Sequence, residues 1–191
     1  MQISFGRKIP ITQCQVYNNQ KKEYTKATCY AFDCKDKSDI EEIEEMGDEW
    51  RYLNETLFNM QRGYMNRDDD RMTSIVVYTL EKPDGEKLGL CTTEDKGRRI
   101  DVNYLETKQD GKHKFAGQTL LASIGTQILN NSQFLFVIRN AVGSAADFYD
   151  KICGFRDNPD NADFTMNREG IRKFIKQTEE RTQAPILEIK A

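Results

Sequence analysis

The stretch LETKQDGKHKFAGQTLL, residues 105–121, decides the fold. It begins at the end of a predicted strand, passes through a lysine-rich loop and enters a predicted helix near Ala116. The first turn of a helix leaves several backbone N–H groups without partners and carries a partial positive charge. Gly117 in this turn allows a ligand to approach the backbone closely. The segment therefore indicates a phosphate or pyrophosphate site, although a solvated lysine-rich loop explains the same pattern.

Upstream, the pattern predicts two strands and one long helix. β-Branched and aromatic residues favour strands at 9–17 and 25–34. Between about 38 and 63, apolar residues recur at every third or fourth position, which is the spacing of one helical stripe. This helix either runs unbroken to Gly63 or is interrupted once near Gly47.

Further along the chain the period changes to that of strands. Three strands joined by short turns are predicted at 74–80, 87–93 and 99–107, and they form an antiparallel meander. The elements that follow are a helix at 116–130, a strand at 133–138, a helix at 144–152, a short strand at 164–166 and a helix at 168–182. This order predicts an α+β fold in a single domain, which suits a chain of 191 residues.

A second motif, FYDKICGF at residues 148–155, lies on the helix after the strand at 133–138. Together with the loop at 105–121, it resembles the GNAT superfamily of acetyl-CoA-dependent N-acetyltransferases. In that family a strand leads into a loop of the form Gln/Arg-x-x-Gly-x-Gly/Ala, and a later helix ends in Phe-Tyr-x-x-x-Gly-Phe. Here Lys112 takes the Gln/Arg place, Phe115 that of the first glycine and Gly117 that of the second. The resemblance covers residues 72–167.

Two departures from the family pattern bear on function. Phe115 stands where the family has a glycine, so the turn must adopt a negative φ or accept strain. The final motif has one extra residue before Gly154, which lengthens the end of the predicted helix. Because the aromatic side chain would narrow the diphosphate cradle, a site that has lost its cofactor-binding function is an alternative.

The resemblance implies a mixed, mostly antiparallel central sheet that is flanked by helices and splayed between the strands at 99–107 and 133–138. Residues 1–191 would form one acyl-CoA N-acyltransferase-like domain. Within it, 1–70 would be a variable part that shapes the acceptor side, 72–167 the cofactor-binding core, and 168–191 a C-terminal helix and tail.

The resemblance also implies where acetyl-CoA would bind as co-substrate. Its pantetheine arm would enter the splay and pair with the strand backbone, and its diphosphate would rest on the amides that open the helix at 116–130. The residues implied in binding are Leu105, Glu106, Thr107, Lys112, Lys114, Phe115, Ala116, Gly117, Gln118, Thr119, Asn140 and Tyr149.

For catalysis, Tyr149 takes the family's position for the acid that protonates the departing thiolate; a packing tyrosine with a satisfied hydroxyl is the alternative. Asp101 and Glu106, the acidic groups on the central strand, are the candidate bases. Strand alternation would place Asp101 with Leu105 on one face and Glu106 on the other, so at most one would face the cleft. Cys153 is interpreted as a buried, inert thiol rather than a covalent nucleophile.

Composition limits the partners and the compartment. Lys and Arg total 28 against 31 Asp and Glu, so there is no strongly basic field and nucleic acid is not expected as a partner. No apolar run is long enough for a membrane helix and the N-terminus lacks a signal sequence, so we expect a cytoplasmic protein. The single histidine and the five scattered cysteines argue against a metal site and against a disulfide framework.

We therefore expect an N-acetyltransferase that moves an acetyl group from acetyl-CoA to a primary amine by direct attack, with a small molecule or a protein amine as acceptor. One alternative is a non-catalytic acyl-CoA-binding or protein-interaction module on the same fold. Another is an effector or toxin that acetylates a macromolecule such as charged tRNA, which a basic face around Arg62, Arg67 and Arg71 would support.

Overall fold

The computed structural model of this chain describes residues 8–47, 50–69, 73–108, 110–141, 143–158 and 163–189. Its strands are β1 (Ile9–Asn18), β2 (Glu23–Asp33), β3 (Ser74–Glu81), β4 (Lys87–Asp95), β5 (Arg99–Thr107), β6 (His113–Lys114), β7 (Leu135–Ile138), β8 (Arg156–Asn158), β9 (Asp163–Asn167) and β10 (Leu187–Glu188). Its helical segments are α1 (Lys37–Glu44), α2 (Leu53–Met65), α3 (Ala116–Asn130), α4 (Gly143–Asp147), η1 (Phe148–Cys153) and α5 (Arg168–Thr182).

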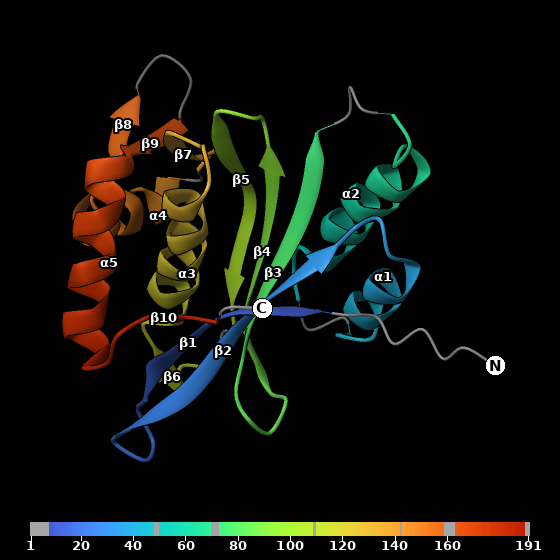
Figure 1. The fold of residues 1–191 in the computed structure, drawn as a ribbon. Helices are drawn as coiled ribbons and strands as arrows, with labels where there is room; N and C mark the ends of the chain where they lie inside the picture. The colour runs from blue at the N-terminus through green and yellow to red at the C-terminus, as the bar shows by residue number, and fades with distance from the viewer. Residues whose placement is uncertain are drawn as a thin grey trace.

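One mixed sheet runs through the molecule in the order β10-β1-β2-β3-β4-β5-β7-β9-β8, with β6 paired to β1. α3 and α5 lie on one side of this sheet, and α1 and α2 lie on the other (Figure 1). Each side has its own hydrophobic cluster, because the meander strands are apolar on both faces. In the described part of the chain, no helix is both long enough and apolar enough to cross a membrane.

The N-terminal part agrees with the sequence pattern except at one glycine. β1 and β2 confirm the predicted strands, and the predicted helix is interrupted: α1 ends at Glu44, Gly47 has φ +82°, and α2 begins at Leu53. The prediction that the helix ends at Gly63 is wrong, since α2 continues to Met65. A Cβ at Gly63 would lie 2.6 Å from the Sγ of Cys34, so this glycine permits close packing instead of ending the helix.

The central feature of the fold is the parting of β5 and β7. These parallel strands pair only from Arg99 with Leu135 to Val102 with Ile138, whereas β5 continues along β4 to Thr107. β7 follows β9 on its other side. The predicted splay between the strands at 99–107 and 133–138 is therefore confirmed, together with the mixed, mostly antiparallel sheet.

A β-bulge lies at the point where the strands part. Thr92 pairs with Tyr104 but the next residue, Thr93, pairs with Val102, so Asn103 is an extra residue on β5. The bulge reverses the alternation of side chains beyond it. The prediction that strand alternation separates Asp101 from Glu106 is therefore wrong.

Candidate active site

The backbone before α3 adopts a conformation that normally requires glycine. Phe115 is the N-cap of α3 and has φ 70° and ψ 3°, which is the left-handed region. The loop before it is held against the β1–β2 hairpin, where Asn19 N donates to the Lys112 carbonyl at 2.7 Å and Asn19 Nδ2 donates to the Gly111 carbonyl at 2.8 Å. The sequence left Phe115 with either a negative φ or a strained turn, and the observed positive φ is the strained conformation.

The first turn of α3 presents free amides. The first helical hydrogen bond runs from Thr119 N to the Phe115 carbonyl at 2.8 Å, and no side chain caps the helix. The N–H groups of Ala116, Gly117 and Gln118 therefore lack a partner within the helix. This turn supplies the donors and the positive dipole end that an anion requires.

The α3 turn opens onto a cavity of about 910 Å³, which we call the first cleft. It lies between the end of β5, the start of α3, and η1. Of the residues predicted to bind the cofactor, those that line it are Leu105, Glu106, Thr107, Lys114, Phe115, Ala116, Gly117, Gln118 and Tyr149. Lining residues that sequence reasoning did not assign to the site are Arg51, Tyr52, His113, Ala145, Phe148 and Ile152.

Three predicted binding residues do not line the first cleft. The Lys112 ammonium lies 3.7 Å from an Asp110 carboxylate oxygen on the loop, and Thr119 is fully buried behind the first helical turn. Asn140 lies beyond the end of β7 and lines a different cavity. The sequence predicted that these three residues lie near the splay, but it did not show which cavity each of them faces.

That different cavity, of about 580 Å³, is called the second cleft. It lies between α2, the middle of β5 and the segment that follows β7. The residues that line both clefts are Tyr52, Leu105, Ala145 and Tyr149. The two cavities therefore meet at the place where β5 and β7 separate.

Tyr149 owes its position to a π-helical turn. The predicted helix at 144–152 is short α4 followed by η1, a π-helix of six residues. The extra residue before Gly154 is absorbed in this wider turn, and Gly154 then ends it with φ 76°. Phe155 remains fully buried, so Tyr149 and Phe155 both keep places in the core.

The Tyr149 side chain is 7 % exposed and packs against the rings of Phe148, Phe155 and Phe164. Burial raises the pKa of its phenol well above the ordinary value, so the hydroxyl is protonated at neutral pH. Among the described residues, no hydrogen-bond partner of this hydroxyl is found. A protonated phenol at the meeting point of two cavities is available as a proton donor.

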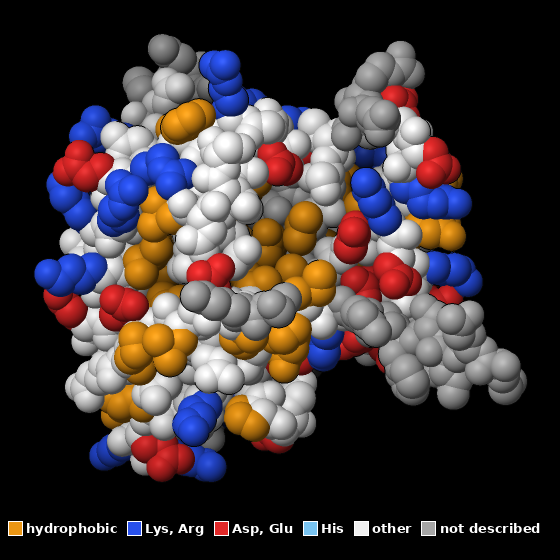
Figure 2. Space-filling model, viewed as in Figure 1, with side chains coloured by type: hydrophobic (Ala, Val, Ile, Leu, Met, Phe, Trp, Pro, Cys, Tyr) orange, Lys and Arg blue, Asp and Glu red, His pale blue; other side chains and the backbone are white. Residues whose placement is uncertain are grey.

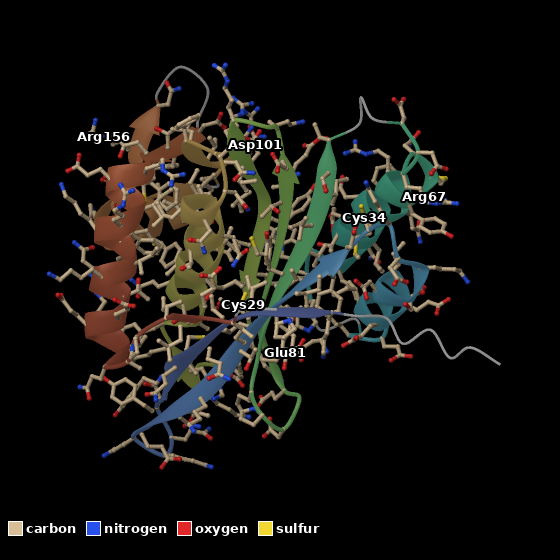
Figure 3. The ribbon with its side chains drawn as sticks, in the orientation of Figure 1. Cys29, Cys34, Arg67, Glu81, Asp101 and Arg156 are labelled. Carbon is tan, nitrogen blue, oxygen red and sulfur yellow. The ribbon has the colours of Figure 1, made fainter. Side chains whose placement is uncertain are left out.

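The two candidate bases differ in placement. Both carboxylate oxygens of Glu106 accept backbone hydrogen bonds at 3.0 Å, from the N–H groups of Arg51 and Tyr52, and Glu106 lines the first cleft. Asp101 is buried at the closed end of the splay, with Arg99 Nε 2.9 Å from its carboxylate (Figure 3). Burial raises the pKa of the Asp101 carboxyl, and this effect exceeds the lowering caused by the positive charge of Arg99. Asp101 lines neither of the two clefts.

His113 is a lining residue of the first cleft that was not among the predicted site residues. Both of its ring nitrogens are buried, and neither has a hydrogen-bond partner in the part of the chain that the structure describes. The short pairing of β6 with β1 places this residue beside the α3 turn. No sequence signal marks this pairing, since β6 has only two residues.

The five cysteines are buried free thiols. Cys153 is 1 % exposed, and burial raises the pKa of its thiol to about 12, as it does for Cys14. We expect none of the five to react with dithiodipyridine at pH 8 within minutes, and all of them to react in urea, as measured by thiopyridone absorbance. Rapid native labelling of Cys153 would restore it as a candidate nucleophile.

The residues of the first cleft fit acetyl-CoA. A Cβ on Gly117 would lie 3.3 Å from Thr107 Cγ2 and 3.4 Å from Phe148 Cζ, so only glycine leaves this part of the cradle open. Gln118 is 4 % exposed and lines the cleft, and its Nε2 has no hydrogen-bond partner among the residues that the structure describes. An orphaned amide donor next to three free backbone N–H groups suits a phosphate oxygen.

A backbone prediction follows from the left-handed Phe115. Phe115→Gly and Phe115→Ala both remove the ring, but only glycine removes the strain. In urea unfolding we expect the glycine variant to be more stable than the alanine variant by about 1 kcal/mol. Equal stability of the two variants would contradict the left-handed conformation.

The sheet order, the parting of β5 from β7 and the flanking helices form a GNAT-like fold. No family model matches the sequence, and no curated protein matches it by sequence. Among solved structures, an uncharacterized protein from Bacillus halodurans is similar with a TM-score of 0.54 and 11% identity, covering 91% of this chain and all (100%) of the other. The structure of AtaTR bound with acetyl-CoA is similar with a TM-score of 0.50 and 15% identity, covering 76% and 96%.

The expectation that nucleic acid is not a partner is corrected by a third structure. The crystal structure of a KacTA–DNA complex is similar with a TM-score of 0.48 and 15% identity, covering 65% of this chain and 82% of that one. Acidic and basic side chains are interspersed on the surface in Figure 2. Of the basic face considered from the sequence, Arg71 lies outside the described residues.

Proposed function

We propose that this chain is an N-acetyltransferase that transfers an acetyl group from acetyl-CoA to a primary amine by direct attack. The observation that carries the proposal is the meeting of two cavities at Tyr149, where β5 and β7 part. One cavity has an anion cradle, and the other reaches the same tyrosine from the opposite end of the splay. Two substrates can thus approach one proton donor.

In this proposal the first cleft holds acetyl-CoA, which supplies a thioester carbonyl. The amides of Ala116, Gly117 and Gln118 donate to the diphosphate, and Lys114 adds a positive charge at the rim. The backbone of β5 beyond Val102, which β7 does not cover, is positioned to pair with the amides of the pantetheine arm.

The reaction requires the amine to be neutral. The nitrogen forms a bond to the carbonyl carbon, the carbon–sulfur bond breaks, and the electron pair stays on sulfur. The hydroxyl of Tyr149 donates its proton to that sulfur, and the nitrogen loses a proton to a base. The proton balance closes when the released amine proton returns to the phenolate through solvent.

Of the two candidate bases, Glu106 is the one that lines a cleft, so we assign it the base role, directly or through a water. It also anchors the Arg51–Tyr52 backbone. Glu106→Gln should therefore lower kcat by about 100-fold or more, as is common when a general base is removed, while Asp101→Asn should leave kcat near the parental value. An unchanged kcat in Glu106→Gln would assign the base to another group.

A macromolecular acceptor is the second candidate function. It is favoured by the similarity to AtaTR bound with acetyl-CoA, because AtaT is named as a toxin in related structures. The catalytic centre would be the same, and only the acceptor would differ. A non-catalytic binding module would bind acetyl-CoA without turning it over.

The experiment combines calorimetric titration of acetyl-CoA with a thiol-release assay against a panel of amines and peptides. Saturable binding followed by amine-dependent thiol release supports the enzyme. Binding without release on any acceptor supports the non-catalytic module. Absence of binding contradicts the proposal as a whole.

A further inference from the structure

The second cleft has a charge pattern that discriminates between amines. Its charged lining residues within the described chain are Arg62, Arg139 and Glu94. Arg139 is already paired, since its guanidinium lies 2.8 Å from the buried carboxylate of Asp163. Glu94 is the only carboxylate among these lining residues, and the Lys96 ammonium lies 2.6 Å from it.

The Glu94 carboxylate is a poor partner for a cationic substrate. Burial alone would raise its pKa, but hydrogen bonds from Lys96 and Thr73, with the nearby charge of Arg62, hold the pKa below its ordinary value. Its negative charge is thus compensated by protein groups. The cleft offers no uncompensated carboxylate from the described residues to a polyamine or a second ammonium group.

Within the part of the chain that the structure describes, Arg62 has a donor atom without an acceptor, although its charge lies near the carboxylate of Glu94. It lies on α2 and lines the second cleft, and its Nε is buried without a hydrogen-bond partner among the described residues. A buried donor on a charged group is costly when it has no acceptor. An anionic group in the second cleft would satisfy this donor, and carboxylates and phosphates match the guanidinium geometry.

Aromatic rings form another wall of the cleft. Tyr52 and Tyr104 stack with ring centroids 5.3 Å apart and an interplanar angle of 26°. Both line the second cleft, and Tyr52 also lines the first. The stack gives an apolar or planar group a surface to pack on beside Arg62.

Resting on the proposed function, we propose that the acceptor is a primary amine that also carries an anionic group, carboxylate or phosphate, which Arg62 binds in the second cleft. The amine then faces Tyr149, and the remainder of the acceptor packs on the Tyr52–Tyr104 stack. Amines with additional positive charge are selected against.

The test uses ligands that resemble the product or the acceptor, so it needs neither acetyl-CoA nor turnover. N-Acetylphenylalanine and N-acetylphenylalaninamide differ only in the carboxylate. In calorimetric titrations we expect the carboxylate to bind about 10- to 100-fold more tightly, which is the usual effect of a charge-assisted hydrogen bond. O-Phosphoethanolamine and ethanolamine form the matching pair for phosphate, and the stronger of the two effects tells which anion is preferred.

Variants assign the effect to Arg62. Arg62→Gln should abolish the preference in whichever pair shows it, while leaving the affinity for the neutral ligand unchanged. Arg67→Gln is the matched control, because Arg67 follows the end of α2, is exposed and stacks on Tyr64 outside both clefts (Figure 3). The control should keep the preference.

Equal affinity within both pairs, tighter binding of the neutral or cationic member, or an undiminished preference in Arg62→Gln would overturn the proposal. Failure of acetyl-CoA to bind would instead contradict the acetyltransferase function. Because the ligand pairs are measured without acetyl-CoA, the two failures are distinguishable.

Discussion

Gly117→Trp is expected to abolish measurable binding of acetyl-CoA. A Cβ at this position already lies 3.3 Å from Thr107 Cγ2 and 3.4 Å from Phe148 Cζ, so a side chain has to extend into the first cleft. An indole there would fill the space over the amides of Ala116 and Gln118. Calorimetric titration of the purified variant measures the loss directly.

Gly143→Trp is the matched control for this substitution. Gly143 has nothing within 4 Å of its ideal Cβ and does not line either cleft. Its variant should bind acetyl-CoA as the parent does. To separate blocking from unfolding, Gly117→Ala should keep the fold, shown by circular dichroism, and weaken binding to an intermediate degree. Parent-like affinity in Gly117→Trp would show that the diphosphate does not rest on this turn.

Tyr149→Phe is expected to lower kcat by about 100- to 1000-fold, as is common when a general acid is removed. The affinity for acetyl-CoA should change little, because the ring and its contacts with Phe148, Phe155 and Phe164 are kept. Single-turnover thiol release measures the chemical step apart from product release.

Tyr78→Phe provides the control, since Tyr78 is also a buried tyrosine of raised pKa but lines neither the first nor the second cleft. Its kcat should stay at the parental value. The pH dependence adds a second readout. Because burial raises the pKa of Tyr149, the acid form persists to higher pH, so kcat should not fall with a midpoint near the ordinary tyrosine value of about 10. Full activity in Tyr149→Phe would assign the acid to another group.

The sequence predicted the elements that local pattern determines. α3 at Ala116–Asn130 and α5 at Arg168–Thr182 agree with the predicted helices, because their apolar stripes are regular and their ends are marked. The parting of β5 and β7 followed only from the family resemblance, since no residue pattern within a strand states where its neighbour leaves it.

Three features were beyond local pattern, for distinct physical reasons. The bulge at Asn103 depends on the register with β4, so alternation read from β5 alone gave the wrong faces for Asp101 and Glu106. The π-helical turn hides the extra residue before Gly154 within an otherwise helical segment. The left-handed conformation of Phe115 is imposed by the surrounding loop against the preference of the residue.

Sequence reasoning named the lining residues of the two clefts more fully where they lie on one element than where several elements bring them together. The amides at the start of α3 and the place of Tyr149 were anticipated from consecutive motifs. Arg62, Tyr52 and His113 were not, because they come from α2, the residues before it, and β6, which only the tertiary fold brings to the clefts. Both Arg62 and Arg67 are basic residues near the end of α2, so the sequence did not show that Arg62 lines a cleft and Arg67 does not.

A crystal structure of the complex with acetyl-CoA tests the central claim most directly. We expect electron density for the pantetheine arm beside Leu105–Thr107, diphosphate oxygens within hydrogen-bond distance of the amides of Ala116 to Gln118, and the thioester next to the Tyr149 hydroxyl. Density bound elsewhere, or β5 and β7 paired through to Thr107 with the Phe115 ring occupying the cradle at saturating acetyl-CoA, would contradict it.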